Sequence, residues 1–226
     1  PIAVQSSTAW KEIPISLIVA ILMLFMINDF IFPSENTYLS RIEGIIMLGL
    51  FFIFLFYVFS QLKNDKETLA EVLPKSTTKI SLLILFGLAG LVLGGQLIVT
   101  NGIKIASSMG VSEKIIGLTI IAAGTSLPEL VTSLVAAFKK NSDIAIGNVI
   151  GSNIFNILLI LSISSIIQPI SFNPKFNLDI LILIGGTVFL LLAMFMGKKR
   201  KLDRWEAGIL FIFYVSYTVF LVLEEI

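Results

Sequence analysis

The feature that most constrains this chain is a series of seven long apolar stretches. A transmembrane helix needs about 20 mainly apolar residues, so each stretch is long enough to cross a bilayer. Backbone polar groups in lipid must be satisfied within the protein, which favours helices, and the short alternating segments typical of a membrane β-barrel are not seen. The pattern predicts an all-α polytopic membrane protein with seven transmembrane helices, at about residues 13–32, 42–62, 80–100, 115–138, 144–167, 177–197 and 205–223.

The composition excludes several other classes of protein. Of the 226 residues, 56% are hydrophobic and 14% are charged, whereas a soluble domain has about 25% charged residues. With no Cys and no His, the chain offers no disulfide framework, no Cys/His metal site and no Ser–His or Cys–His nucleophile pair. The net charge of +1 gives no general attraction for nucleic acid, so we expect a lipid bilayer as the surroundings and no nucleic-acid partner.

The distribution of basic residues predicts the orientation in the membrane. Twelve of the 16 Lys and Arg residues lie on the same side as the N-terminus, and the positive-inside rule makes that side cytoplasmic. The longest connection, residues 63–79, is charged and contains Pro74, which indicates a solvated cytoplasmic linker. An odd number of spans then places the C-terminus outside.

The chain also resembles itself. Pro1–Ile2 and Pro169–Ile170 each precede two spans, and between the spans of each pair lies a matching patch, LSRIEG at 39–44 and LDRWEA at 202–207. The two copies begin five spans apart, so they have opposite orientations, and inverted repeats are typical of secondary transporters. Because three spans precede the second copy and none precedes the first, we expect three equivalent spans upstream of residue 1.

One acidic residue lies near the middle of a predicted span. Glu129 is the sole ionisable residue between Lys114 and Lys139, and a carboxylate at that depth costs at least a few kcal/mol, which makes it a functional candidate. It ends the motif GTSLPE, residues 124–129. A protonated structural Glu is the alternative.

The same motif predicts a break in the helix. Pro128 has no N–H, so the carbonyl of Gly124 loses its helical partner. We expect the helix to open here and to free main-chain carbonyls from Ala122 to Thr125. The hydroxyls of Thr125 and Ser126, four and three residues before Glu129, are placed to share its face. The motif therefore predicts a pocket of oxygen atoms.

The next span carries a second polar motif, GNVIGSNIFN at 147–156, in a stretch with no charge from Ile144 to Pro174. Asn148, Ser152 and Asn156 are spaced by four residues, which places them on one helical face. Gly147 and Gly151 permit either close helix packing or a second helix break. Small polar residues often only pack helices, and both interpretations stay open for Asn148, Gly151 and Asn153. For Ser152 and Asn156 we favour ion ligation opposite Glu129.

All these donors are oxygens, which suit calcium and also sodium. The segment 124–161, GTSLPELVTSLVAAFKKNSDIAIGNVIGSNIFNILLIL, resembles the second α-repeat of the sodium/calcium exchanger family, within the cation/calcium antiporter superfamily. Residues 80–226 resemble the complete second five-helix half of a member, and residues 1–62 resemble only the last two helices of the first half. The resemblance implies a ten-helix antiporter made of two inverted five-helix halves.

The resemblance also implies roles for individual residues. Glu129 would be the acidic ligand shared by calcium and sodium, and the helix at 80–100 would be one of two long gating helices. The remaining implied ligands are Thr125, Ser126, Ser152 and Asn156, with a carbonyl from Ala122. The first α-repeat, with its own Glu, is absent from this chain, so we expect a fragment whose N-terminal half completes the site. The short linker lacks the calcium-sensing domains of some animal members, which indicates a prokaryotic type in the cell membrane.

The sequence thus favours sodium-driven calcium antiport by alternating access, with calcium and sodium as transported ions and no bound cofactor. Proton- or potassium-coupled exchange within the same superfamily is the nearest alternative, because Glu129 could itself titrate. A non-transporting membrane module is a third. We expect no enzyme, because Ser126 and Ser152 have no His or membrane-embedded Lys to activate them.

Overall fold

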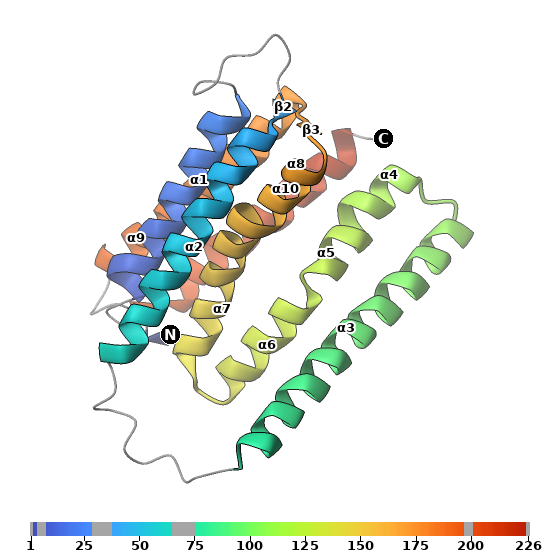
Figure 1. Cartoon of the computed structure of the whole chain (residues 1–226). Helices are drawn as coiled ribbons and strands as arrows, with labels where there is room; N and C mark the ends of the chain where they lie inside the picture. Colours follow the sequence, from blue (N-terminus) through green and yellow to red (C-terminus); the bar gives the residue numbers. More distant parts are fainter. Residues whose placement is uncertain (1, 4–7, 29–37, 65–75, 197–200, 225–226) are drawn as a thin grey trace. The chain divides into compact units, whose positions relative to one another are not determined.

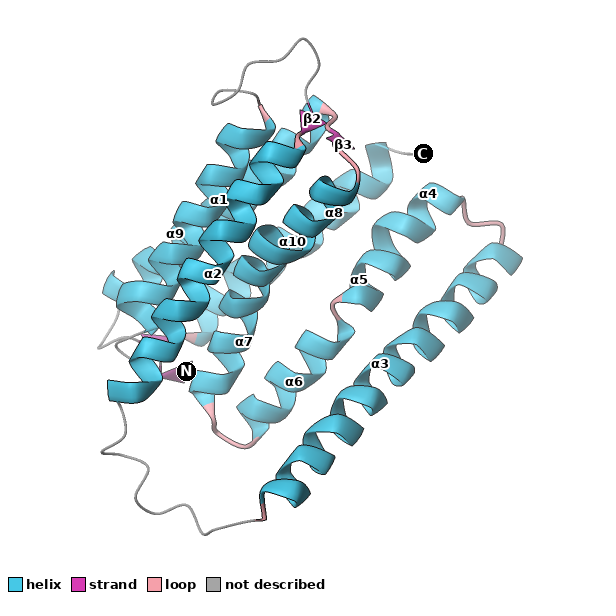
Figure 2. Ribbon diagram, in the orientation of Figure 1, coloured by secondary structure: helices cyan, strands magenta, loops and turns pink. Residues whose placement is uncertain are grey.

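The computed structural model describes residues 2–3, 8–28, 38–64, 76–196 and 201–224. The chain divides into two compact units, which we describe separately. The first contains residues 1–71 and 141–203, and the second contains residues 72–140 and 204–226. Both are helical, with four two-residue strands in the first unit (Figures 1 and 2).

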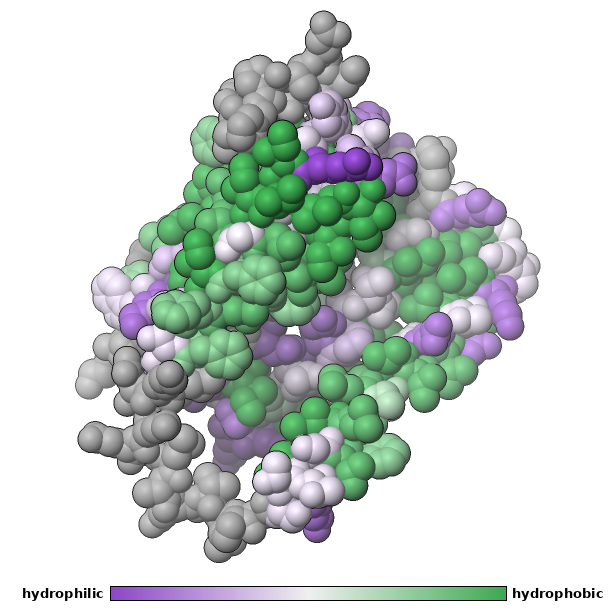
Figure 3. Space-filling model, in the orientation of Figure 1, coloured by the Kyte–Doolittle hydropathy of each residue, from purple (hydrophilic) through white to green (hydrophobic). Residues whose placement is uncertain are grey.

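The seven predicted spans are confirmed as six long apolar helices and one bent pair, although residues 29–32 and 197 of the predicted ranges lie outside the described residues. The six are Trp10–Ile27, Arg41–Gln61, Thr77–Ser108, Ser142–Ile167, Pro174–Phe195 and Arg204–Glu224. The pair is Gly117–Thr125 with Leu127–Phe138, bent by 52°. Figure 3 shows broad apolar surfaces on the visible face, as expected for helices that contact lipid. The chain is an all-α multi-pass membrane protein.

Helix pairs α1–α9 and α2–α8 form the centre of the first unit. Its helices are η1 (Thr8–Glu12), α1 (Ile13–Ile27), α2 (Arg41–Asn64), α7 (Ser142–Phe155), η4 (Asn156–Leu161), α8 (Ser162–Ile167), η5 (Pro174–Phe176) and α9 (Asn177–Met196). Its core includes the fully buried side chains Ile13, Met47 and Ile154. The end of α1 is joined to the start of α9 by paired amides, because Asn28 Nδ2 donates to Asn177 Oδ1 (2.7 Å) and Asn177 Nδ2 donates to Asn28 Oδ1 (2.8 Å).

The second unit contains α3 (Thr77–Ser108), α4 (Glu113–Ile116), η3 (Gly117–Ile121), α5 (Ala122–Thr125), α6 (Leu127–Phe138) and α10 (Arg204–Glu224). Helix α3 has 32 residues and is about 48 Å long at 1.5 Å per residue, which exceeds a hydrocarbon core of about 30 Å. The predicted span 80–100 is therefore the apolar part of a longer helix. The predicted linker 63–79 is shortened at both ends by helix, and residues 65–75 lie outside the described residues.

The short strands join the two copies of the internal repeat. Strand β1 (Ile2–Ala3) pairs antiparallel with β4 (Lys201–Leu202), and β2 (Tyr38–Leu39) pairs antiparallel with β3 (Ile170–Ser171). Ile2 faces Leu202 in the same way that Ile170 faces Leu39. In both ribbons the strand that begins one copy, β1 or β3, thus pairs with the strand that precedes the second helix of the other copy. Two copies related by a two-fold axis would make this exchange.

The repeated patch begins a helix in each copy. In the first copy the N–H of Ser40 donates to Glu43 Oε2 (2.8 Å), and the N–H of Glu43 donates to Ser40 Oγ (3.2 Å). This reciprocal pair is a capping box, which satisfies backbone donors at the start of α2. Asp203 and Glu206 hold the equivalent positions at the start of α10. The residues of the repeated patch thus stand at the start of a helix in both copies.

The residue after the first capping box allows close packing between α2 and α8. A Cβ atom added at Gly44 would collide with Ser165 Oγ and would lie 2.9 Å from the Ser162 carbonyl oxygen. Ser162 and Ser165 are both fully buried, so their side chains have little space to move. Glycine at position 44 therefore sets the distance between these two helices.

We expect Gly44→Ala to lower the melting temperature of the detergent-solubilised protein. Overpacking of this kind costs about 1–3 kcal/mol. Gly49→Ala is the matched control in the same helix, because no described atom lies within 4 Å of the added Cβ, and Ala is a better helix former than Gly. Equal melting temperatures for the two variants would contradict the close packing of α2 on α8.

Candidate ion-binding site

The predicted helix break is present in the second unit. Helix α5 ends at Thr125, Ser126 forms a turn, and α6 begins at Leu127, with a bend of 52° between the two segments. Pro128 is in the first turn of α6, where its missing N–H is tolerated. The break thus separates the short helical segment Gly117–Thr125 from the regular 12-residue helix α6. The kink is visible between the α5 and α6 labels in Figure 1.

Two hydroxyls occupy the break, and both bond to one carbonyl. Thr125 Oγ1 donates to the carbonyl oxygen of Ala122 at 2.9 Å, and Ser126 Oγ donates to the same oxygen at 3.5 Å. The prediction that the carbonyls of this turn would be free is wrong for Ala122, which accepts from two hydroxyls, and for Ala123 and Gly124, whose carbonyls accept from the N–H of Ser126. A donating hydroxyl still keeps two acceptor lone pairs, so the oxygens of Thr125 and Ser126 can accept a cation.

Glu129 follows the break directly. It is the third residue of α6 and the acidic residue of that helix's first turn, where the helix dipole stabilises a negative charge. Its side chain is half-buried, and the Oε2 atom is inaccessible to solvent. One carboxylate, two hydroxyls and a main-chain carbonyl therefore occur within eight consecutive residues around one bend. These hard oxygen donors are of the type that calcium takes.

Helix α3 packs closely against the break, a contact that the sequence did not reveal. A Cβ atom at the buried Gly124 would collide with Cγ2 of Val99 on α3. A Cβ atom at Gly95 would lie 3.9 Å from the Gly124 carbonyl oxygen, and one at Gly102 would lie 3.1 Å from Ile120. Glycines at these positions let the two backbones approach, as small residues do between membrane helices. Gly124 therefore has a packing role as well as a place in the broken turn.

The second polar motif lies in the first unit. Ser152 is in α7, where its Oγ donates to the Val149 carbonyl at 3.0 Å, and Asn156 is the first residue of η4. Four-residue spacing keeps both on one face with Asn148. Ile150 and Ile154 are buried, and each lies two positions from Ser152, which is about 200° around the helix. They therefore form the opposite, core-facing side. The polar face therefore points away from the core of this unit.

The structure does not show the second helix break that Gly147 and Gly151 permitted. Helix α7 is continuous from Ser142 to Phe155, and no described atom lies within 4 Å of a Cβ added at either glycine. The irregularity comes later, as a π-helical segment from Asn156 to Leu161. Such π segments often occur at functional sites. No simple sequence signal marks this one, since the segment NILLIL is uniformly apolar after its Asn.

The predicted site residues therefore fall into two groups. Ala122, Thr125, Ser126 and Glu129 lie together at the bend of the second unit, and Ser152 and Asn156 lie on the polar face of the first unit. Each group gathers oxygen atoms of the type that calcium and sodium take. That the two groups bind the same ion stays a prediction.

Comparison with known proteins identifies the family. The profile of the family described as "Sodium/calcium exchanger protein" matches residues 79–223. The chain is 37% identical over 227 residues to the CaxA protein of Alkalimonas amylolytica, covering 96% of this chain and 69% of the relative. It is 40% identical over 136 residues to the sodium/calcium exchanger MaX1 of Methanosarcina acetivorans, covering 59% of this chain and 38% of that protein.

A solved structure agrees with these sequence matches. The structure of the sodium/calcium exchanger from Methanococcus jannaschii superposes with a TM-score of 0.76 at 30% identity, covering 97% of this chain and 66% of that one. The chain thus spans between about two fifths and two thirds of the length of these relatives. The sequence resemblance is confirmed, and the chain belongs to the sodium/calcium exchanger protein family.

Proposed function

We propose that this chain is part of a sodium-driven calcium antiporter that works by alternating access. The observation that carries the proposal is the 52° bend in an apolar span, with Glu129 in the first turn after it. A broken membrane helix that presents oxygen atoms near the midplane is how many secondary transporters hold their ions. Membership of the exchanger family makes cation antiport the reaction class, and structures of the relative from Methanococcus jannaschii were obtained after soaking with Na⁺ and Sr²⁺.

In this proposal each predicted residue has a defined role. Glu129 is the charged ligand that calcium and sodium share. Thr125, Ser126 and the Ala122 carbonyl complete the coordination from the same bend, and Ser152 and Asn156 supply neutral oxygens from α7 and η4. Neutral oxygens of this kind suit sodium, and a shared carboxylate makes the two ions compete.

The negative charge of the proposed ion site explains why one ion must be exchanged for the other. We propose that an upstream copy of the motif in the whole protein supplies a second Glu, giving a site charge of about −2. An empty site of that charge is costly to move through hydrocarbon. One Ca²⁺ or several Na⁺ would neutralise it, so only a loaded site changes sides. The long helix α3, packed against the bend through Gly124, would be one of two gating helices.

The orientation proposed for this function has the 63–79 connection in the cytoplasm and the C-terminus outside, in a prokaryotic cell membrane. The chain has no native Cys, so single cysteines can report on it. A membrane-impermeant maleimide should label Lys175→Cys and not Lys140→Cys in intact cells. The reverse pattern would contradict the orientation.

Calcium binding to the purified full-length protein provides a first test. A ligand that binds the folded state raises its stability by RT ln(1 + [L]/Kd), about 2.7 kcal/mol at 100 times the Kd. We expect calcium to raise the melting temperature in detergent and sodium to weaken that effect, because the two ions share Glu129. A non-transporting module should show no ion-dependent shift, and that result would contradict the proposal.

A further inference from the structure

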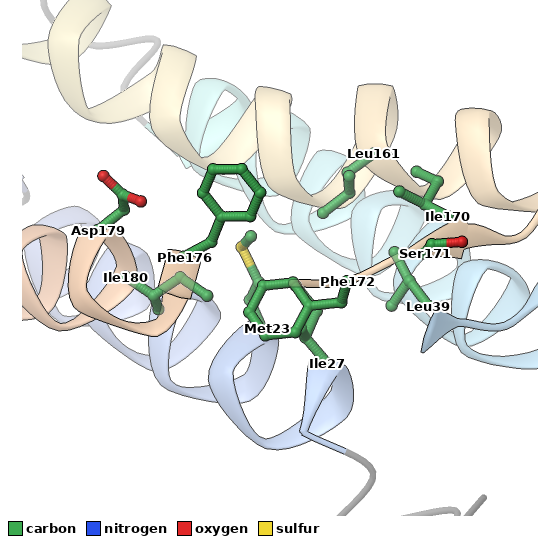
Figure 4. Close-up of a pocket in the computed structure, with 10 residues that line it drawn as sticks. All are labelled: Met23, Ile27, Leu39, Leu161, Ile170, Ser171, Phe172, Phe176, Asp179 and Ile180. Atoms are coloured by element: carbon green, nitrogen blue, oxygen red, sulfur yellow. The ribbon is translucent and has the colours of Figure 1, made fainter. Parts of the chain in front are cut away.

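A cavity of about 400 Å³ lies in the first unit, and none of the residues proposed to bind ions lines it. It is formed by the end of α1, by η4, by the β2–β3 ribbon and by η5 with the start of α9. Eight of the ten described residues that line it are apolar. The other two, Ser171 and Asp179, lie at opposite ends of the group in the view of Figure 4.

The cavity lies where three membrane spans end or begin. Leu161 lies six residues before the end of the span Ser142–Ile167, and Ile180 lies six residues after the start of the span Pro174–Phe195. At 1.5 Å per residue, six residues correspond to about 9 Å of helix. The β2–β3 ribbon lies just outside the spans. The cavity therefore extends from the membrane boundary toward the depth at which acyl chains surround the protein.

The lining residues differ in their exposure. Ile27, Leu39 and Ile180 are buried and form a closed floor. Phe176, by contrast, is 55% exposed, so its ring lies between the cavity and the surroundings of the protein. Ser171 is also exposed. The cavity is thus closed on one side by the core and open on the side of η5 and β3.

The size and lining of the cavity suit a hydrocarbon chain. At about 30 Å³ per water, the volume corresponds to roughly a dozen water molecules, and apolar walls give water few hydrogen-bond partners. An empty cavity would forfeit the dispersion contacts of its walls. Ligand sites in proteins typically enclose about 300–1,000 Å³ and are lined mainly by apolar and aromatic side chains. At this depth in a membrane, the abundant apolar molecules are the acyl chains of the bilayer lipids.

The lining offers no means of selecting a charged headgroup. Guanidinium and ammonium groups are the usual protein partners of phosphate, and none of the ten described lining residues is Arg or Lys. Asp179 is the one charged residue among them. The chemistry of the walls is therefore directed at the hydrocarbon chain of a lipid and not at its headgroup.

We propose that the cavity binds one acyl chain of a bilayer lipid, whatever the charge of the lipid headgroup. The chain packs against Met23, Leu161 and Phe172, and it leaves the cavity past Phe176, so the headgroup stays outside the cavity. The site requires no residue of the proposed ion pocket. It can therefore be tested independently of antiport.

Photocross-linking of the full-length protein in lipid nanodiscs tests this proposal. The probe is phosphatidylcholine with a diazirine at the end of one acyl chain, and peptide mass spectrometry identifies the residues to which it becomes linked. We expect saturable cross-links to residues that line the cavity, above a non-saturable background on exposed apolar helix faces. Excess unlabelled phosphatidylcholine and phosphatidylglycerol should compete equally, because the site binds the chain and not the headgroup.

Two substitutions that fill the cavity complete the test. Met23→Trp and Leu161→Phe each add bulk to its walls and should lower the saturable cross-linking at least about tenfold. Leu161→Phe is the smaller change, so it decides the question if Met23→Trp does not fold. The matched controls are Met109→Trp and Leu97→Phe, which make the same replacements at exposed residues of the second unit and should cross-link like the unmodified protein.

Three results would overturn the proposal. The first is cross-linking by the unmodified protein that never rises above the background at the cavity. The second is competition by one of the two lipids and not by the other. The third is unchanged cross-linking in the folded cavity-filling variants.

Discussion

Glu129→Gln should abolish sodium-driven calcium uptake by the full-length protein in proteoliposomes. The substitution keeps the size of the side chain and removes the one charge at the bend of the α5–α6 span. The neutral oxygen ligands that remain cannot replace the attraction between the Glu129 carboxylate and a divalent cation. We therefore expect calcium affinity to fall at least about 100-fold, equivalent to about 2.8 kcal/mol. Radioactive calcium uptake at several calcium concentrations measures the effect.

Two further variants separate charge from position. Glu129→Asp keeps the charge on a shorter side chain and should retain part of the uptake. Glu113→Gln removes an exposed carboxylate from α4 in the same unit and should transport normally. Normal uptake by Glu129→Gln would show that the ion is bound elsewhere.

Gly124→Ala should lower calcium uptake at least about tenfold, although it touches no charge. The added methyl collides with Val99 Cγ2 on α3, and overpacking of this kind costs about 1–3 kcal/mol. The collision has to be relieved by moving α3 away from the bend or by distorting the break itself. Either movement displaces Thr125 and the Ala122 carbonyl. Uptake and melting temperature should be measured together.

A second substitution distinguishes these explanations. Val99→Ala removes the atom that collides, so the double variant Gly124→Ala with Val99→Ala should regain much of the lost uptake. Gly87→Ala is the matched control on α3, where no described atom lies within 4 Å of the added Cβ. If Val99→Ala gives no rescue, the loss arises within the broken turn and not from packing on α3.

Much of this fold could be predicted from local sequence properties. Hydropathy located all seven spans, because burial in lipid demands long apolar runs. The bend before Glu129 was predicted because Pro128 removes a specific backbone donor. The inverted repeat was visible in two short patches, and the exchanged β1–β4 and β2–β3 strands agree with it.

Other features depend on tertiary contacts and could not be predicted in this way. Helix α3 continues beyond residue 100 through Asn101 and Lys104, because a helix that leaves the hydrocarbon no longer needs apolar side chains. The contact of Val99 with Gly124 joins residues 25 positions apart, and no periodic pattern marks it. The π segment that begins at Asn156 shifts the helical register within a uniformly apolar run.

The ion that drives calcium uptake distinguishes sodium-driven antiport from proton- or potassium-coupled exchange. The full-length protein, reconstituted in vesicles, should be given an outward sodium gradient, an outward proton gradient or an outward potassium gradient in turn, with calcium outside. A sodium-driven antiporter should take up calcium rapidly with the sodium gradient alone and not with the other two. Uptake that follows the proton or potassium gradient and ignores sodium would contradict sodium-driven antiport.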